Sequence, residues 1–231
     1  MNSSTIVSRS RVKPNRVVTI AAAAVISLAA CSGGESSGPL EESIYPNTMV
    51  PSNSTAALGT RTSQAPTNGQ PAGPAFDDFT LNNGGSVRTV SWQGTYCRQT
   101  AANSPAPTPT ASVFTVSIHA DASGRPATTS LRTATFTLAQ ANQQLEKTVP
   151  GLTCGLANNV TVALYNYSVT LPDAFTAAAG QKYWISIVAT TPTYDVLYGW
   201  RDGTASNNVS LQLYQGTYST LTADRAFALA K

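Results

Sequence analysis

The feature that most constrains the fold is an alternation of large apolar and polar residues that recurs between residues 75 and 231. In the run Val113–His119, the side chains of Phe114, Val116 and Ile118 fall on one face of an extended strand, because successive side chains point to opposite sides. Similar runs lie at 90–96, 165–169, 183–188, 195–200, 209–214 and 224–230. Turn-forming residues separate these runs, and no helical period recurs. The sequence therefore predicts an all-β fold, a single antiparallel β-sandwich of about eight or nine strands.

One stretch also allows a helix. Within residues 138–147, Leu138, Ala141 and Leu145 are spaced for one helical face, but Pro150 follows closely. The pattern leaves a short helix and a loop open at this place.

The N-terminus has the pattern of a secretory signal peptide. Residues 1–16 carry four basic residues and no acidic one, and residues 17–30 are apolar apart from Thr19 and Ser27. As a helix, this apolar stretch would be about 21 Å long, which is short of the roughly 30 Å hydrocarbon core of a membrane. Residues 1–30 are thus predicted to be a signal peptide rather than a membrane span.

The end of that segment, Leu28-Ala29-Ala30-Cys31 followed by Ser32, resembles the lipobox of bacterial lipoproteins. The resemblance implies that the thiol of Cys31 is lipidated and that the chain is cut just before it. It also implies a protein anchored to the cell envelope by lipid, at the outer membrane if the host has two membranes, because Ser32 resembles the outer-membrane sorting signal.

Residues 31–74 are rich in Ser, Thr, Gly, Pro, Asn and Ala, with no sustained apolar period. Such a segment buries too little apolar surface to offset its chain entropy, so we expect a flexible linker after the lipidated cysteine. Residues 75–231 hold all six phenylalanines, all three tryptophans and eight of the nine tyrosines. The sequence thus predicts one folded domain over 75–231.

The folded part also resembles a jelly-roll-like domain common in bacterial exported and surface-anchored proteins. The resembling segments are Phe76-Asp77-Asp78-Phe79, Val90–Tyr96, His119-Ala120-Asp121, Gly124-Arg125-Pro126, Tyr167-Ser168-Val169, Tyr183–Ile187 and Arg225–Leu229. The relatives of such domains among β-sandwiches are mostly carbohydrate-binding or adhesive modules. The resemblance implies a binding or adhesion module without a known catalytic activity.

The charge distribution argues against a nucleic-acid partner. The formal net charge is +3, but the first thirty residues contribute four basic groups, and the remainder holds ten basic against eleven acidic residues. A folded part with this balance lacks the basic excess that phosphate binding requires.

Two of the three cysteines are predicted to form a disulfide. If Cys31 carries lipid, Cys97 and Cys154 remain as an even pair in an oxidising compartment. A metal pair or a catalytic thiol is the alternative, but neither cysteine has a CxxC spacing.

Catalytic groups are scarce, so we expect no enzymatic activity and no cofactor. His119 is the single histidine, and its strand phase predicts a surface or hydrogen-bonded side chain rather than a catalytic one. No G-x-S-x-G motif is present. Asp78 enters the first strand and Asp224 the last, so they are weak candidates for a structural Ca²⁺ site.

Aromatic residues gather in the last third of the chain, among Asn, Gln and Asp residues. Tyr194, Tyr198, Trp200 and Tyr214 are candidates for stacking on sugar rings, with core packing and an amphipathic rim as the alternative. The sequence therefore predicts a lipid-anchored envelope protein with a non-enzymatic binding or adhesion module, for which carbohydrate is one candidate ligand. The alternative is a structural envelope lipoprotein that contacts a protein partner, and a hydrolase ranks third.

Overall fold

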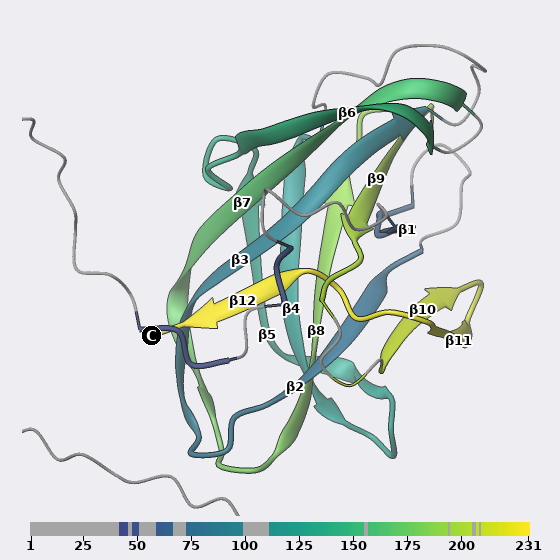
Figure 1. Cartoon of the computed structure of the whole chain (residues 1–231). Helices are drawn as coiled ribbons and strands as arrows, with labels where there is room; N and C mark the ends of the chain where they lie inside the picture. The colour runs from purple at the N-terminus through teal and green to yellow at the C-terminus, as the bar shows by residue number, and fades with distance from the viewer. Residues whose placement is uncertain are drawn as a thin grey trace, which may run out of the picture. The chain divides into compact units, whose positions relative to one another are not determined.

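Two antiparallel sheets face each other in the structure, a computed structural model that describes residues 42–45, 48–50, 59–66, 73–98, 111–154, 157–193, 195–204, 207 and 209–231 (Figure 1). The strands are β1 (Thr60–Thr62), β2 (Ala75–Thr80), β3 (Gly85–Arg98), β4 (Val113–Asp121), β5 (Pro126–Thr137), β6 (Gln144–Cys154), β7 (Ala157–Ala177), β8 (Lys182–Thr190), β9 (Val196–Arg201), β10 (Ser210–Tyr214), β11 (Thr217–Leu221) and β12 (Phe227–Ala230). These described ranges contain no helix, and hence none that could cross a membrane. The all-β class predicted from the alternation is confirmed.

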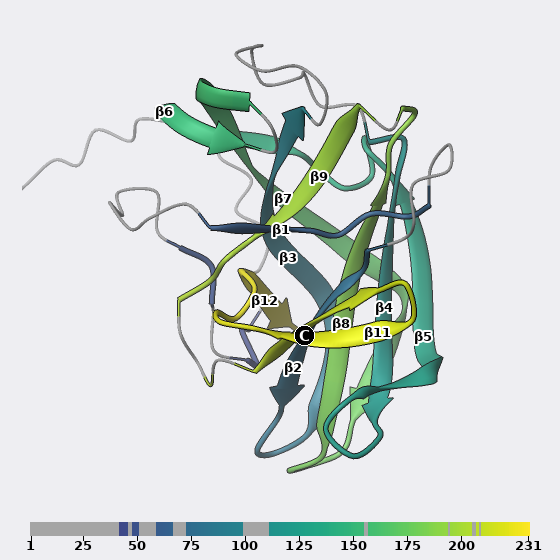
Figure 2. The same ribbon diagram turned by 90° about the vertical axis from the view of Figure 1, so that its right-hand side faces the viewer.

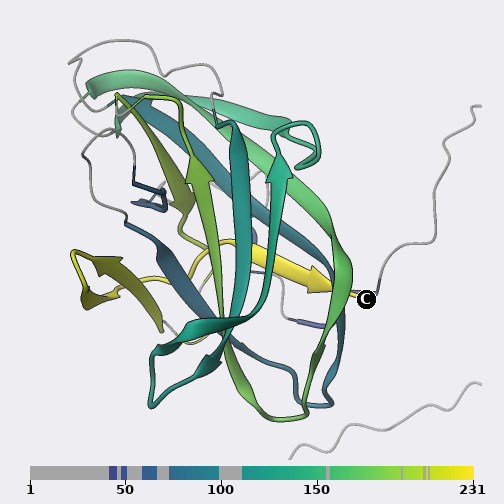
Figure 3. The same ribbon diagram turned by 180° about the vertical axis from the view of Figure 1, so that it is seen from behind.

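The first sheet has the order β1-β9-β3-β7-β6, and β12 pairs with β3 next to the stretch that pairs with β9. The second sheet has the order β11-β10-β2-β8-β4-β5. Every ladder between these strands is antiparallel. The teal strands β4 and β5 lie toward the viewer in Figure 3.

The described residues form twelve strands, more than the eight or nine expected. The strands that the alternation missed are β1, β5, β6 and β11, which lie at the ends of the two sheets. Strands in such positions need few apolar residues, because much of their surface faces solvent. In the stretch 138–147, the structure has a turn over residues 138–142 and the start of β6 at Gln144. The helix is therefore wrong, and the loop is right only for the first half of the stretch.

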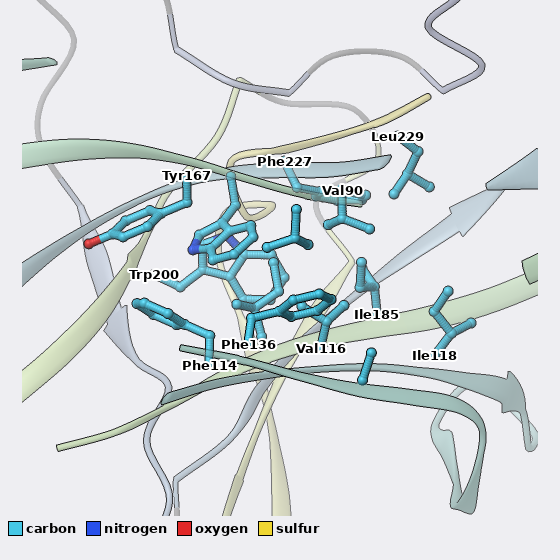
Figure 4. Close-up of a cluster of buried hydrophobic side chains, with 14 of the residues drawn as sticks. Val90, Phe114, Val116, Ile118, Phe136, Tyr167, Ile185, Trp200, Phe227 and Leu229 are labelled. Atoms are coloured by element: carbon cyan, nitrogen blue, oxygen red, sulfur yellow. The ribbon is translucent and has the colours of Figure 1, made fainter. Parts of the chain in front are cut away.

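The space between the sheets is filled by aromatic and aliphatic side chains (Figure 4). Trp92 is fully buried and stacks on Tyr167 with ring centroids 5.1 Å apart, and Phe114 meets it edge-on at 5.4 Å. The Nε1–H of Trp92 donates to the hydroxyl of Tyr198 at 2.9 Å. Gly94 allows this contact, because a Cβ there would lie 2.2 Å from the same hydroxyl.

The described residues of 42–66 form a segment that we call the N-terminal strap. Ser43 forms a β-bridge with Ala230, the Ile44 N–H donates to the Leu229 carbonyl at 3.0 Å, and β1 pairs with β9. For these residues, the expected flexible linker over 31–74 and the domain start at 75 are wrong. The reason is that backbone hydrogen bonds to exposed strands hold the strap, and such bonds leave no apolar period in the sequence.

The strap also places a few side chains in buried positions. Tyr45 is 7% exposed, stacks on Phe227 at 5.1 Å and donates its hydroxyl to the Asp78 carbonyl at 3.2 Å. The hydroxyl of Thr48 lies 2.7 Å from the Arg225 carbonyl and 2.9 Å from the Phe227 carbonyl. The strap is therefore an integral layer of the compact unit Pro39–Lys231.

Candidate functional site

The strap forms one wall of a cleft of about 500 Å³. Glu42–Tyr45 line it from the strap, Thr80–Gly84 from the turn between β2 and β3, and Asn207 and Lys231 complete it. At the rim, the Lys231 ammonium pairs with the Glu42 carboxylate at 2.7 Å. The cleft thus lies where the N-terminal strap contacts Lys231.

The cleft presents three asparagine side chains, Asn82, Asn83 and Asn207. The first two are exposed in the turn after β2, which closes with a hydrogen bond from the Gly84 N–H to the Leu81 carbonyl at 3.0 Å. Gly84 has φ +66°, a conformation that glycine adopts without strain. The amides of Asn82 and Asn83 each offer two donors and an acceptor, so this part of the lining can bind hydroxyl groups in either sense.

Asn207 is held in place by two aspartates. Its Nδ2–H₂ group donates to both carboxylate oxygens of Asp78, at 3.0 and 3.1 Å, and its backbone N–H donates to Asp224 at 2.9 Å. Lys182 pairs with Asp78 at 3.0 Å. The cleft therefore has a preorganised polar wall.

The candidate calcium residues Asp78 and Asp224 are thus brought to the same loop, as their positions at the two ends of the domain suggested. Asp78 lies within β2 and Asp224 precedes β12, and these two strands do not pair with each other: β2 pairs with β8 and β10, and β12 with β3. The Asp78 and Asp224 carboxylates accept hydrogen bonds from side-chain and backbone N–H groups. Among the described residues, no group of three His, Cys, Asp or Glu side chains is arranged to hold a metal ion.

Asp77 precedes Asp78 on β2 and lies deeper in the fold. It is 1% exposed and accepts hydrogen bonds from the backbone N–H groups of Asp78 and Arg225. Burial raises the pKa of its carboxyl well above the ordinary value, and the charges of Asp224 and Asp78 raise it further. The Asp77 carboxyl therefore acts as a buried hydrogen-bond acceptor that holds the backbone of Asp78 and Arg225.

The aromatic site predicted from the last third of the chain is wrong for Trp200 and Tyr198. Both side chains are fully buried, with the Trp200 indole N–H donating to the Ala226 carbonyl at 3.0 Å. Their strand, β9, lies between β1 and β3, and their side chains pack into the core, so neither ring can stack on a sugar. Tyr214 is 50% exposed at the tip of β10, and Tyr194 lies outside the described residues.

The single histidine is hydrogen-bonded, as its strand phase predicts. One ring nitrogen of His119, Nδ1, lies 2.8 Å from the Ala127 carbonyl, and the other, Nε2, lies 2.9 Å from the Ser117 hydroxyl. Phe76 packs edge-on against the imidazole at 5.6 Å. Both nitrogens are therefore engaged within the second sheet.

The cysteine predictions are only partly covered by the described residues. Cys97 is disulfide-bonded in the structure. The side chain of Cys154 and the whole of Cys31 lie outside the described residues, so the Cys97–Cys154 pairing and the lipidation of Cys31 stay predictions.

A second polar cluster lies on the first sheet, and the sequence patterns did not predict it. Arg201 is 1% exposed and its guanidinium pairs with Glu146 at 3.4 Å, while Gln93 donates to Glu146 at 2.9 Å and to Asn166 at 3.0 Å. Val50 of the strap covers it, exchanging hydrogen bonds with the Gln93 amide at 2.9 and 3.0 Å. No sequence motif predicts this cluster, because its members come from four separate strands and the strap.

The comparisons with known proteins bear on the family alone. A family model described as a domain of unknown function, DUF7901, matches residues 50–225. Neither the search of curated proteins nor the search of solved structures found a match.

Proposed function

The chain belongs to the DUF7901 family, a domain of unknown function, and from that premise we propose that it is a lipid-anchored protein of the bacterial envelope. In this proposal the β-sandwich is a non-enzymatic binding module, and its asparagine-lined cleft takes a polyhydroxylated ligand of the carbohydrate class. The observation that carries the proposal is the pair of exposed amide side chains, Asn82 and Asn83, in a cleft whose opposite wall is fixed by the hydrogen-bonded Asn207.

The anchor is supported by the lipobox-like residues that end at Cys31. The strap is hydrogen-bonded to β12 from Glu42 onward, eleven positions after that cysteine. Eleven residues can span at most about 40 Å when fully extended. A lipid on Cys31 would therefore keep the cleft wall within that distance of the membrane, which suits a ligand displayed on the envelope surface.

The ligand class is supported by the chemistry of the cleft. Asn82 and Asn83 supply amides, Thr80 supplies a hydroxyl, and the one carboxylate in the lining, Glu42, is paired with Lys231. Neutral donors and acceptors of this kind suit sugar hydroxyls. Because the predicted aromatic residues Trp200 and Tyr198 are buried, the cleft replaces them as the proposed site.

The non-enzymatic character is supported by the state of the titratable groups. Both nitrogens of His119 are engaged in hydrogen bonds, and the carboxylates of Asp77 and Asp78 accept protein N–H groups. A general acid or base must reach its substrate within hydrogen-bond distance. These groups are already committed to the fold.

The anchor is tested by replacing its cysteine. We expect a Cys31→Ser variant to incorporate no fatty acid when cells are labelled with radioactive palmitate and to remain as the uncut precursor. Fatty-acid label of native strength on the variant would contradict the anchor.

The cleft is tested with residues 39–231, which include the whole compact unit, on a glycan array and by titration with the sugars that bind. We expect Asn82→Ala and Asn83→Ala each to weaken sugar binding by about tenfold, since each removes hydrogen bonds to the ligand worth about 1 kcal/mol or more. The matched control is Thr135→Ala, an exposed position on β5.

An array without saturable binding would contradict the proposed ligand class. Specific co-purification of one envelope protein with the crosslinked full chain would then favour the alternative, a structural lipoprotein with a protein partner.

A further inference from the structure

Apart from β12, whose outer side the strap covers, the sheets of the described residues end in four strands, β1, β6, β5 and β11. Three of these four carry features that discourage pairing with another chain. Edge strands are usually protected by shortness, charge, proline or bulges. β1 has three residues, β6 contains Glu146, Lys147 and Pro150 with several register shifts, and β5 has shifted register and an Arg132–Asp173 ion pair to β7. β11 has none of these protections.

The sequence around β11 carries no charged residue over a long stretch. No Asp, Glu, Lys, Arg or His occurs from Gly203 to Ala223, which includes both strands of the β10–β11 hairpin. The register between β10 and β11 runs without a shift from Ser210 to Leu221. Two copies of the hairpin could therefore approach each other without like-charge repulsion between the hairpins' own side chains.

The hairpin is also held rigidly on the domain. The Gln212 amide donates to the carbonyls of Thr62 and Gly73 at 2.6 and 2.8 Å. Tyr218 packs edge-on against Phe76 at 6.0 Å, and the Arg125 guanidinium lies 5.7 Å from the Tyr218 ring centre. A strand held in this way loses little conformational freedom when it pairs.

The turn fixes which backbone groups of β11 point outward. Gln215 and Gly216 have φ +48° and +77°, which makes a two-residue turn that closes on the pair Tyr214–Thr217. In such a hairpin, alternate residues direct their N–H and C=O groups to the partner strand. Thr217, Ser219 and Leu221 thus face β10, and Tyr218 and Thr220 direct their backbone groups to the open edge, which lies toward the viewer in Figure 2.

We propose that β11 pairs with β11 of a second copy of this chain, antiparallel about a two-fold axis at Ser219. In this register, Tyr218 of each copy lies opposite Thr220 of the other, and the two residues exchange N–H···O bonds in both directions. This register uses every outward-directed backbone group of Tyr218 and Thr220. It also sets an aromatic residue opposite a β-branched one, a favourable cross-strand pair. The second sheet becomes continuous across the two copies.

The register is tested by single cysteines in the full chain, purified from envelopes in detergent and oxidised mildly. Two Ser219→Cys side chains would face each other across a non-hydrogen-bonded pair, where the Cα atoms are about 4.5 Å apart and a disulfide can form. The matched control is Thr217→Cys on the same exposed face, whose copies would lie about 13 Å apart along the strands. We expect at least about tenfold more disulfide dimer from Ser219→Cys than from Thr217→Cys on non-reducing gels.

Equal or absent crosslinking of the two variants would overturn the proposal. Crosslinking of Ser219→Cys to a different protein, without the homodimer, would overturn the choice of a second copy.

A second pair of variants tests the hydrogen bonds. Thr220→Pro, introduced into the Ser219→Cys chain, removes an outward N–H and leaves the bonds to β10 in place. We expect it to lower the yield of disulfide dimer by about tenfold or more, because each interface loses two backbone hydrogen bonds. Thr220→Val keeps the N–H and should keep the yield. A yield unchanged by Thr220→Pro would overturn the pairing, whatever the fate of the proposed anchor and cleft.

Discussion

Between the two sheets, Trp92, Phe114 and Tyr167 are almost completely buried and contact one another through their rings. Where the N-terminal strap contacts the rest of the fold lies a second buried region, which is polar and which we call the seam. It is formed by Thr48 of the strap and by Asp77, Gln93, Arg201 and Arg225. The interior depends on apolar area removed from water, and the seam depends on hydrogen bonds that replace lost solvation. The comparison shows that the two faces of β3 and β9 are covered in chemically different ways, because neighbours such as Trp92 and Gln93 point to opposite sides of the strand.

The two buried arginines mark the difference most clearly. Arg201 pairs with Glu146, and Arg225 pairs with Asp202 and donates to the Ala223 carbonyl. Burial lowers the pKa of both guanidinium groups, and the nearby carboxylates counteract that shift. Folding therefore removes two charged groups from water in the seam, a desolvation cost that the apolar interior does not have.

Removal of the strap is expected to have the largest effect. A chain that starts at Ala75 loses Tyr45, Val50 and the hydrogen bonds of Thr48, a loss of about 5 kcal/mol or more. That is comparable with the whole stability of many domains, so the shortened chain should unfold at ambient temperature. Urea unfolding of residues 75–231 beside residues 39–231 measures it. Equal midpoints would mean that the strap is a dispensable covering and that the seam contributes little.

Trp92→Ala tests the interior. Its ring is fully buried against Phe114 and Tyr167, and it also loses the hydrogen bond to Tyr198, so we expect a loss of about 3–5 kcal/mol. The measurement is the free energy of unfolding by urea in the 39–231 unit. A loss below about 1 kcal/mol would place the stabilising packing elsewhere than between the sheets.

Thr48→Val tests the seam with little change of volume. It removes a hydroxyl that accepts the Phe227 N–H at 2.9 Å and contacts the Arg225 carbonyl at 2.7 Å. Leaving such buried groups without a partner costs about 1–3 kcal/mol. The control is Thr135→Val on the exposed face of β5, which should change the free energy of unfolding by less than about 0.5 kcal/mol. Similar values for the two variants would contradict the hydrogen-bonded seam.

Asp77→Asn tests the pH dependence of the seam and has the smallest expected effect. Burial raises the carboxyl pKa in the folded state above its unfolded value near 3.8, so the folded state binds the proton more tightly. The native protein should therefore lose stability relative to the Asp77→Asn variant as the pH rises from about 4 toward the raised pKa. Unfolding free energies of both proteins between about pH 4 and pH 7 measure this difference. A difference that is flat, or that grows in the native protein's favour with pH, would contradict the raised pKa.

The sequence by itself determined the all-β class and the faces of the central strands. Phe114, Val116 and Ile118 are inside because alternation along a strand is a local property that pairing cannot change without a register shift. It also determined that His119 lies on the opposite face of the same strand, where it is hydrogen-bonded. Turn residues such as Gly84 marked the ends of elements for equally local reasons.

Only the tertiary structure decided the strap, the cleft and the seam. Tyr45 and Thr48 lie in a stretch of linker-like composition, and nothing local shows that β12 and β9 leave backbone groups for that stretch to pair with. Trp200 and Tyr198 alternate like any half-buried strand, so the burial of both depended on which neighbours cover β9. Asn207 reaches the same cleft as Asn82 because distant segments converge there. Which segments lie next to each other depends on the order of the strands in the sheets, and the residue pattern of a single strand does not encode that order.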